Sequence, residues 1–491
     1  MVSESAKSTP TVPQRLDTVT QWDFETDVAI VGFGGAGACA AIEAADAGAE
    51  VCLFEVSAAS GGSTALSSAE VYMGGNGGTR VQRACGYEDS TEDMFNFLMA
   101  AQGDLADEAK IRMYCDNSVE HCDWLVRMGA KYKDSELKER AIMAMTDDCL
   151  LYTGNEKSFP FRNIAKPCPR GHNLEVVGDN GGPMLMGILT ENVEKRPIRV
   201  EYNVRALRLI ADESNVVHGL VVRVDGKERN VRARKGVILC AGGFVMNREM
   251  LEKYVPQLKL ANIPIGSPGD TGTGILMGQG VGGAVIHMNE AFVTLPFYPP
   301  GSLTFGIFVN AQAQRFINED IYHARMAHHI LKQVGQGIYL IVNHDDYTHP
   351  RFLNADIVGT GETIEELAAE IGLDAGMLCH TVEFYNTHAA KRTDPLFHKH
   401  EAWLKPIEPP YAALDCTPGN GAIYPYFTLG GLDTLPTGEV LTMDGAVIPG
   451  LFAAGRTSCG LPRTAAGYGS GMSVGDATYF GRVAGKRAAG L

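Results

Sequence analysis

Apolar runs separated by glycine turns predict a strand–helix–strand unit near the start of the chain. The four apolar residues at 28–31 predict a short buried strand, and the small residues at 38–47 predict a helix. A second apolar run at 51–54 predicts the next strand. Because two parallel strands need a crossover between them, this order predicts one βαβ unit.

Further along the chain, the spacing of apolar residues changes between strand-like and helical periods. Residues 198–243 predict short alternating strands that end in a buried strand at 236–240. Residues 140–182 show no regular period and predict loops. Helices are predicted within 90–130, at 184–195, 275–284, 364–372 and 377–391, and in the small-residue segment before the C-terminus.

The first βαβ unit carries the glycine pattern of a dinucleotide site. Residues 32–37 read Gly-Phe-Gly-Gly-Ala-Gly, which is GxGxxG between a strand and a helix. Such glycines let the backbone approach a pyrophosphate, whose charge then faces unpaired N–H groups at the helix N-terminus. Glu55 follows Gly32 by 23 positions, where an acid accepts hydrogen bonds from ribose hydroxyls.

Composition limits the classes of function. With 491 residues the chain exceeds one compact core, so we expect two domains. The net charge of −16, without a stripe of Lys and Arg, argues against a nucleic-acid surface. The 11 cysteines are scattered without a CxxC pair or ligand-like histidine spacing, which indicates a reduced cytoplasmic protein without a metal site.

The N-terminal segment and the hydropathy of the chain predict neither a leader nor a membrane anchor. Residues 1–20 are polar and contain prolines, and they lack the apolar core of a leader, so we expect a flexible arm. No run approaches the roughly 18 apolar residues that a membrane span requires, so no integral membrane segment is expected.

The order of the motifs favours FAD over NAD. A GxGxxG unit followed much later by the strand and turn VILCAGG at 237–243 is typical of flavoproteins with two dinucleotide folds. The predicted fold is α/β (α+β overall), with a Rossmann-like FAD-binding domain at 21–289 and 411–491. An α+β catalytic domain is expected as an insertion at 290–410, with the active site in the cleft between the two.

Several glycine turns and helix starts supply the N–H and hydroxyl groups that a bound FAD needs. The turn at 60–65 carries hydroxyls, and the last helix is expected to aim N–H groups at the flavin. The predicted cofactor residues are Gly32, Gly34, Gly35, Ala36, Gly37, Glu55, Val56, Gly62, Ser63, Thr64, Ala65, Val204, Ala241, Gly242, Gly243, Asp270, Gly455, Arg456, Ser473 and Val474.

With these motifs the sequence resembles the flavoprotein family of fumarate reductases, succinate dehydrogenases and 3-ketosteroid dehydrogenases. Besides the βαβ unit, the matching segments are GGSTA at 61–65, VILCAGGF at 237–244, RFINED at 315–320, FTLGG at 427–431 and GLFAAGR at 450–456. Covalent members of the family attach flavin through a histidine soon after the glycine turn. Residues 60–80 contain no histidine, so the resemblance implies non-covalent FAD.

The departures from the fumarate reductase pattern indicate the substrate. Those enzymes hold a dicarboxylate with two arginines and a histidine, because burying a carboxylate unpaired costs several kcal/mol. At the three matching places this chain has Tyr322-His323, Phe427 and Tyr468. We therefore expect a neutral, mostly hydrocarbon substrate that bears a ketone.

The segments NEDIYHAR, TLGGL, FAAGR and GYGSG are most similar to bacterial 3-ketosteroid Δ4-(5α)-dehydrogenases. The resemblance implies a small hydrophobic steroid as substrate and formation of a 4,5 double bond in ring A. It places the catalytic groups of that subgroup on Tyr322, Tyr468 and Ser470. Arg456, at a position where fumarate reductases have a glutamate, also fits the subgroup.

The expected mechanism removes a proton beside the ketone while the neighbouring carbon gives hydride to flavin N5. Tyr468 and a backbone N–H near Gly471 are the expected donors to the ketone oxygen. Tyr322 is the first candidate for proton acceptor, directly or through Ser470, and which of the two takes the proton stays open. His323 is a candidate to assist Tyr322 and, with Phe427 and Gly471, to line the substrate site.

Three other functions compete with this interpretation. A 3-oxosteroid 1-dehydrogenase shares the fold and the tyrosine chemistry, and a soluble enoate reductase would resemble fumarate reductase. A flavin-binding protein without catalysis is the third. The chain has neither an iron–sulfur pattern nor a haem CxxCH, so its electrons are expected to leave for an external acceptor.

Overall fold

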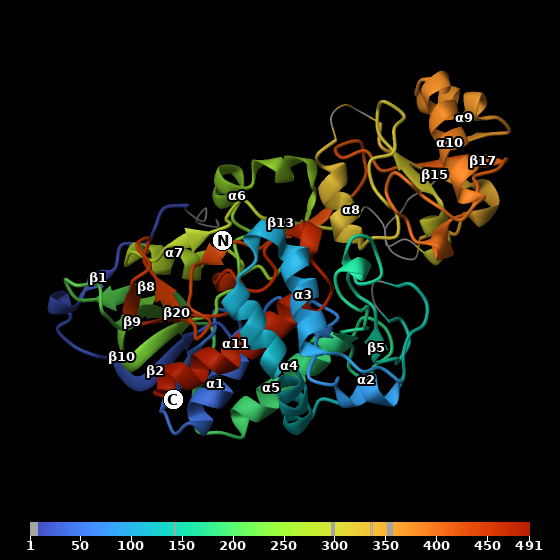
Figure 1. Ribbon diagram of the computed structural model, residues 1–491. Coiled ribbons are helices and arrows are strands. Elements are labelled where there is room, and N and C mark those ends of the chain that lie inside the picture. The colour runs from blue at the N-terminus through green and yellow to red at the C-terminus, as the bar shows by residue number, and fades with distance from the viewer. Residues whose placement is uncertain (1–7, 142–143, 296–299, 334, 336, 351–356) are drawn as a thin grey trace.

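The computed structural model describes residues 8–141, 144–295, 300–333, 335, 337–350 and 357–491. Figure 1 shows a larger body built around a mixed sheet and a smaller body that contains α9, α10, β15 and β17. The predicted α/β class with a Rossmann-like unit is confirmed.

The centre of the larger body is a nine-stranded sheet. Its parallel part consists of β7 (Ile198–Glu201), β3 (Val51–Phe54), β2 (Phe24–Val31), the second half of β10 (Lys227–Leu239) and β21 (Val447–Ala453). The first half of β10 pairs antiparallel with β9 (Val217–Val224), which pairs with β8 (Arg205–Ala211). Since the carboxyl ends of parallel strands meet at one edge, this edge is where a ligand cleft forms.

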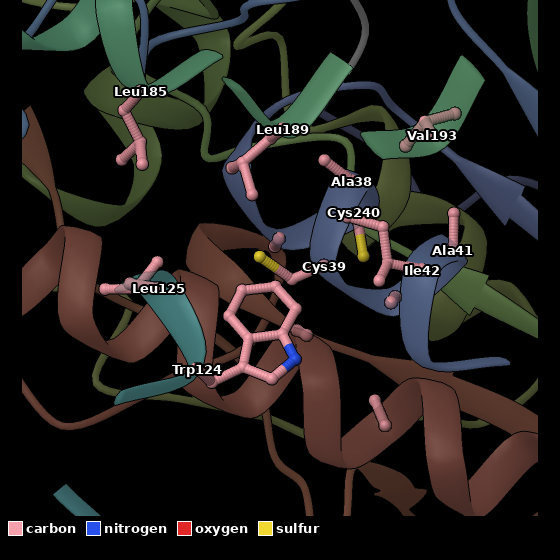
Figure 2. Close-up of a cluster of buried hydrophobic side chains, with 14 of the residues drawn as sticks. Ala38, Cys39, Ala41, Ile42, Trp124, Leu125, Leu185, Leu189, Val193 and Cys240 are labelled. Carbon is pink, nitrogen blue, oxygen red and sulfur yellow. The ribbon is translucent and has the colours of Figure 1, made fainter. Parts of the chain in front are cut away.

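Helices cover the parallel strands, and glycines decide how closely they approach. The helix α1 (Gly35–Asp46) begins at Gly35 rather than at residue 38, because the glycine turn already forms its first turn. It packs against α11 (Met472–Ala489), where a Cβ at Gly481 would lie 2.4 Å from the carbonyl oxygen of Ala36. Figure 2 shows the adjoining core, in which Trp124 of α4 (Glu108–Met128) and Leu189 of α5 (Gly181–Glu194) face α1.

The smaller body has its own sheet and core. Its four strands are β14 (Ile307–Val309), β15 (Tyr339–Asn343), β17 (Tyr411–Asp415) and β16 (Ile357–Gly361). The helices α9 (Ile364–Ile371) and α10 (Ala375–Ala389) pack on it through the buried Leu367 and Leu378. β17 pairs with β15 and β16, so residues 411–415 lie with the insertion and not with the FAD-binding part to which the prediction assigned them.

Short elements connect the two bodies and complete the larger one. A three-stranded sheet joins β11 (Ile263–Pro264), β18 (Pro425–Thr428) and β13 (Ala291–Val293), and α8 (His323–Ile330) lies beside it. Within the described residues of the predicted loop at 140–182, the regular elements are β5 (Leu150–Leu151), a short 3-10 turn, β6 (Gly171–His172) and the first two residues of α5. The remaining elements are α2 (Arg80–Ala84), α3 (Thr91–Gln102), α6 (Arg248–Tyr254), α7 (Thr273–Gly280), β4 (Val71–Tyr72), β12 (Val285–Ile286), β19 (Gly431–Leu432) and β20 (Glu439–Leu441).

The N-terminal segment packs against the larger body, contrary to the prediction of a flexible arm. β1 (Gln14–Arg15) pairs with β8, and the backbone N–H of Thr11 donates to the carbonyl of Leu276 at 2.9 Å. A Cβ at Gly280 would lie 1.8 Å from the Thr11 carbonyl oxygen, so glycine there makes room for the segment. Residues 1–7 of the predicted arm lie outside the described residues.

No helix within the described ranges combines the length and the apolar character that crossing a bilayer would take.

Candidate active site

A cavity of about 490 Å³ follows the carboxyl edge of the parallel strands and reaches the junction with the smaller body. Val31, Phe54, Cys240 and Ala454 bring the ends of four strands to its wall. The predicted cofactor residues that line it are Gly32, Gly34, Gly35, Ala36, Glu55, Val56, Gly62, Ser63, Thr64, Val204, Ala241, Gly242, Asp270, Gly455, Arg456, Ser473 and Val474.

Three predicted cofactor residues lie outside this wall and have packing roles. A Cβ at Gly37 would lie 1.9 Å from the carbonyl oxygen of Gly32, so this glycine lets α1 start directly against the strand. A Cβ at Gly243 would lie 2.8 Å from the Thr428 hydroxyl. Ala65 packs against the core between α1 and α5.

The groups at the glycine-turn end of the cavity could hold the adenine dinucleotide of FAD. The buried Glu55 carboxylate accepts hydrogen bonds from the backbone N–H of Phe33 at 2.7 Å and of Ser57 at 2.8 Å. These bonds fix the carboxylate beside the glycine turn, and each oxygen keeps a lone pair for a ribose hydroxyl. The N-terminus of α1, where Gly35 N–H donates to Thr64 Oγ1 at 3.1 Å, adds the positive end of a helix dipole for the pyrophosphate.

One buried carboxylate joins three distant segments of the cavity wall. Asp270 accepts a hydrogen bond from Ser63 Oγ at 2.7 Å and forms an ion pair with Arg456 at 2.5 Å. A Cβ at Gly242 would lie 1.9 Å from the same carboxylate. Because Asp270 neutralises Arg456, this guanidinium is not an unmatched cation that would attract a carboxylate substrate.

The far end of the cavity is aromatic. Phe292 stacks on Phe427 with ring centroids 4.5 Å apart and meets Tyr468 edge-on at 4.7 Å. Tyr322 lies parallel to Tyr468 at 6.3 Å, and all four side chains line the cavity. Sequence reasoning missed Phe292, although it pairs directly across from Phe427 in β13 and β18 and so faces the same side of that sheet.

Hydroxyl groups lie among these aromatic rings. The hydroxyls of Tyr322 and Ser470 are 2.6 Å apart, and Tyr468 donates to Ser473 Oγ at 2.9 Å. Burial, partly offset by the hydrogen bond to Ser473, raises the pKa of Tyr468 to about 12. Tyr468 is therefore protonated at neutral pH and can donate a hydrogen bond.

Backbone contacts hold Tyr322 and Ser470 in place. Tyr322 occupies the N-cap position of α8, and its N–H donates to Asn155 Oδ1 at 2.9 Å. Ser470 N–H donates to the carbonyl of Thr153 at 2.9 Å, and the Thr153 hydroxyl returns a bond of 2.9 Å to the Ser470 carbonyl. Gly471 has φ of +91°, and a Cβ there would lie 2.7 Å from Tyr72 N, so only glycine fits beside Ser470.

His323 lies against Tyr322, with ring centroids 4.1 Å apart, and it lines the cavity. Its Nδ1 forms a hydrogen bond with the Thr294 hydroxyl. Burial, reinforced by the positive charge of Arg140, lowers the pKa of His323 to about 3. The imidazole is therefore neutral at physiological pH and does not assist Tyr322 through a positive charge.

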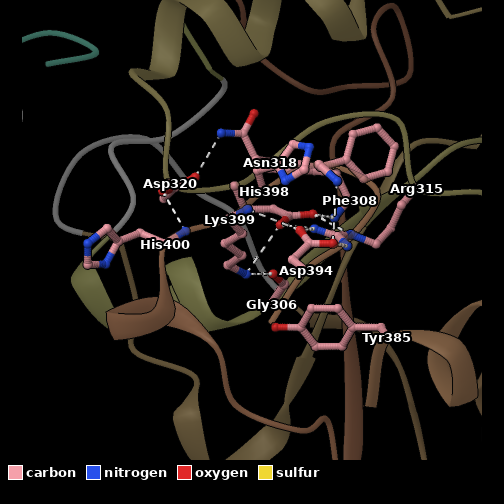
Figure 3. Close-up of polar contacts among 12 residues, drawn as sticks. Gly306, Phe308, Arg315, Asn318, Asp320, Tyr385, Asp394, His398, Lys399 and His400 are labelled. Carbon is pink, nitrogen blue, oxygen red and sulfur yellow. Dashed lines mark hydrogen bonds and ion pairs between the residues drawn. The ribbon is translucent and has the colours of Figure 1, made fainter. Parts of the chain in front are cut away.

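The RFINED segment before Tyr322 is anchored by buried ion pairs in the smaller body (Figure 3). Arg315 binds Glu319 at 2.8 Å and Asp394 at 3.1 Å. Lys399 adds an ion pair to Glu319 at 3.2 Å and donates to the carbonyl of Gly306 at 2.7 Å. Within this group of four side chains the two cations balance the two anions, and the group fixes the segment that leads to Tyr322.

Three charged side chains on the cavity wall were absent from the prediction: Glu70, Asp179 and Arg205. Glu70 is an isolated acid within the apolar run Ala-Glu-Val-Tyr-Met at 69–73, and that contrast is the sequence signal for it. In the part of the chain that the structure describes, no group of three or more His, Cys, Asp or Glu side chains is placed to hold a metal ion.

Comparisons with known proteins agree with this geometry. Residues 27–472 match a family model described as an FAD binding domain. The crystal structure of 3-ketosteroid-Δ4-(5α)-dehydrogenase from Rhodococcus jostii RHA1, in complex with 4-androstene-3,17-dione, superposes with a TM-score of 0.92 at 43% identity, covering 98% of this chain and 100% of that one.

Two relatives show the range of activities among similar sequences. A cytochrome-containing fumarate reductase of Shewanella frigidimarina is 29% identical over 477 residues, which cover 94% of this chain and 77% of that protein. A 3-oxo-5-alpha-steroid 4-dehydrogenase of Comamonas testosteroni is 26% identical over 501 residues, which cover 89% of this chain and 93% of that protein.

Proposed function

The chain belongs to the FAD-binding flavoprotein family that includes fumarate reductases and 3-ketosteroid dehydrogenases, and from this membership we propose that it dehydrogenates ring A of a 3-oxosteroid. It is an FAD-dependent oxidoreductase acting on CH–CH groups. The proposed reaction converts a 3-oxo-5α-steroid into the 3-oxo-4-ene steroid, with FAD held without a covalent bond and with an external electron acceptor. The steroid activities of the Rhodococcus and Comamonas relatives support this substrate class.

The observation that carries the proposal is the aromatic end of the cavity. Four rings, from Phe292, Tyr322, Phe427 and Tyr468, surround hydroxyl groups there. A hydrocarbon substrate gains about 25 cal/mol for each Å² of apolar surface that such walls remove from water. Arg456 lies 5.3 Å from the Phe427 ring, but Asp270 already neutralises it, so a dicarboxylate would gain no unpaired cation there and the site favours a neutral ketone over fumarate.

The side chains divide the chemistry between two groups of hydroxyls. When bound, FAD supplies a two-electron acceptor for the hydride that leaves the substrate. Tyr468 donates a hydrogen bond to the ketone oxygen, where negative charge develops as the neighbouring C–H bond breaks. Tyr322 and Ser470, 2.6 Å apart, form the pair that accepts the proton. The surrounding aromatic rings exclude water and so strengthen these interactions.

The proposal is tested by anaerobic mixing of the purified yellow protein with 5α-androstane-3,17-dione. The expected result is bleaching of the flavin absorbance and a product with its double bond at C4. A product with its double bond at C1 would replace the proposal with the 1-dehydrogenase. Turnover of fumarate with reduced viologen, without bleaching by any 3-oxosteroid, would refute it.

A further inference from the structure

Glu70 lies beside the segment that carries Ser470 and is not used by the chemistry described above. Glu70 is only 2% exposed, yet it lines the same cavity as the hydroxyls of Tyr322 and Ser470. The backbones of the two segments are in contact, since Tyr72 N–H donates to the Gly471 carbonyl at 3.2 Å. A Cβ at Gly471 would also lie 3.2 Å from the carbonyl carbon of Glu70. Glu70 and Ser470 are therefore held side by side.

The Glu70 carboxyl group is poorly compensated for a buried acid. Its Oε1 is buried and has no hydrogen-bond partner among the described residues. Burial raises the pKa of this carboxyl well above its usual value, and the neighbouring acids Asp179 and Glu156 raise it further. The Ser470 side chain acts in the opposite direction and lowers the pKa of the carboxyl. Such a group is costly to bury, so its presence calls for a functional reason.

We propose that Glu70 is the terminal proton acceptor of a relay that runs from Tyr322 through Ser470 to Glu70. This inference rests on the proposed dehydrogenation. The C–H bond beside the ketone breaks, and its electron pair stays on the substrate as the enolate. The proton goes to the Tyr322 oxygen, the Tyr322 proton goes to Ser470, and the Ser470 proton goes to the Glu70 carboxylate.

Each member of the relay ends the step in a defined protonation state. Tyr322 and Ser470 each gain one proton and lose one, and Glu70 changes from carboxylate to carboxylic acid. If Ser470 itself faces the substrate carbon, the same acceptor serves a relay with one transfer fewer. In either case Glu70 acts through Ser470 and does not touch the substrate, so it is a positioning residue for the base.

Asp179 gives the relay an outlet to water. It lines the cavity with Glu70 but is exposed, and it interacts electrostatically with the Glu70 carboxyl. Because burial raises the pKa of the Glu70 carboxyl, its carboxylate is a stronger base than that of an ordinary surface acid, which suits it to collect a proton from hydroxyl groups. The proton then passes to Asp179 and to solvent between turnovers.

The experiment separates proton removal from hydride transfer. Dithionite-reduced enzyme cannot accept hydride, so in D₂O it only exchanges a hydrogen at C4, beside the C3 ketone of 5α-androstane-3,17-dione. Mass spectrometry follows the incorporation of deuterium. Glu70→Gln should slow this exchange at least about tenfold and remove the rise of exchange rate with pH, because the relay then ends on a neutral amide. Glu70→Asp should restore part of both.

A matched control is Glu290→Gln, which neutralises another partly buried acid whose pKa is raised by burial, outside the cavity wall. It should leave the exchange rate unchanged. FAD content and melting temperature should match the wild type in all three variants. A Glu70→Gln protein that exchanges and bleaches within threefold of the wild type, with the same pH profile, would overturn the relay.

A second variant keeps the test decisive if Glu70→Gln does not fold. Asp179→Asn changes an exposed side chain and removes one acid that raises the pKa of Glu70. The other groups that face Glu70 are Glu156, Ser470 and Tyr468. The inflection of the exchange rate should therefore move to lower pH, and an unmoved inflection would overturn the relay. A wild-type enzyme that neither exchanges nor bleaches would instead refute the proposed function.

Discussion

Replacing Tyr468 with phenylalanine removes one hydroxyl from the aromatic end and leaves the ring. The ring is 6% exposed and packs edge-on against Phe292 at 4.7 Å and parallel to Tyr322 at 6.3 Å. Phenylalanine makes the same ring contacts, so Tyr468→Phe isolates the contribution of the O–H group.

The structure allows the effects on stability and on rate to be separated. In the folded protein the hydroxyl makes one neutral hydrogen bond, to Ser473 at 2.9 Å, and losing such a bond costs about 1 kcal/mol of folding free energy. In the transition state the same hydroxyl faces growing negative charge on the ketone oxygen. Losing one donor of that kind lowers kcat by about 10²–10³-fold, which is about 2.7–4 kcal/mol. The loss of rate should therefore far exceed the loss of stability.

The assay is the anaerobic rate of flavin bleaching at saturating steroid, measured with the ratio of FAD to protein and the melting temperature. Tyr426→Phe is the matched control, because Tyr426 is 8% exposed, lies next to Phe427 in β18 and packs into the core outside the cavity wall. It should bleach at the wild-type rate. A Tyr468→Phe enzyme that binds FAD and keeps more than a third of the wild-type rate would refute the assignment of Tyr468 as the ketone donor.

Three further predictions concern the fold around the site. Glu319→Gln leaves the buried Arg315 and Lys399 without their shared anion and should lower the free energy of unfolding by about 3–5 kcal/mol in urea titrations. Glu252→Gln, which removes an exposed ion pair, should leave the free energy of unfolding unchanged. Equal effects of the two substitutions would contradict the role of the buried ion pairs. Gly471→Ala should abolish flavin bleaching, because the new Cβ would lie 2.7 Å from a backbone atom. Gly490→Ala should only lower the melting temperature slightly, because Gly490 has φ of +101° but open space around it. Flavin bleaching by the Gly471→Ala protein would contradict the steric argument. Burial lowers the pKa of His172 to about 4, below the value of about 6.5 in the unfolded chain, so the unfolded state binds the extra proton as the pH falls. This residue should therefore lower the free energy of unfolding by about 2 kcal/mol between pH 7 and pH 5. A His172→Gln protein whose stability falls equally steeply with pH would contradict this prediction.

Local physics explains what the sequence could predict. The strand at 28–31, the glycine turn and the helix after it depend on neighbouring residues, and they formed as expected apart from a helix start at Gly35. Because the ends of parallel strands gather at one edge, most of the predicted cofactor residues line one cavity. The family resemblance assigned Tyr322 to the same site as Tyr468 and Ser470, and all three line one cavity although Tyr322 lies far from the other two in the chain.

The features that the sequence did not predict depend on contacts between remote segments. Phe292 joins the aromatic end because β13 pairs with β18, and no pattern within either strand specifies that partner. Asn155 lies in an irregular loop and acts through a single bond to the backbone of Tyr322. The segment at 11–15 is polar, and it is ordered because β8 and the space at Gly280 receive it.

The bond between Tyr322 and Ser470 spans 148 positions of sequence, from the insertion to the last segment of the cofactor domain. In the proposed mechanism the two oxygens together form the proton-accepting pair, so this pair is complete only while the segment around Tyr322 is docked against the last segment. Any separation of these two segments would break the Tyr322–Ser470 hydrogen bond and would interrupt the proposed proton abstraction. Substrate entry and proton abstraction would then occur at different times, and a ligand that is only partly bound would not be deprotonated.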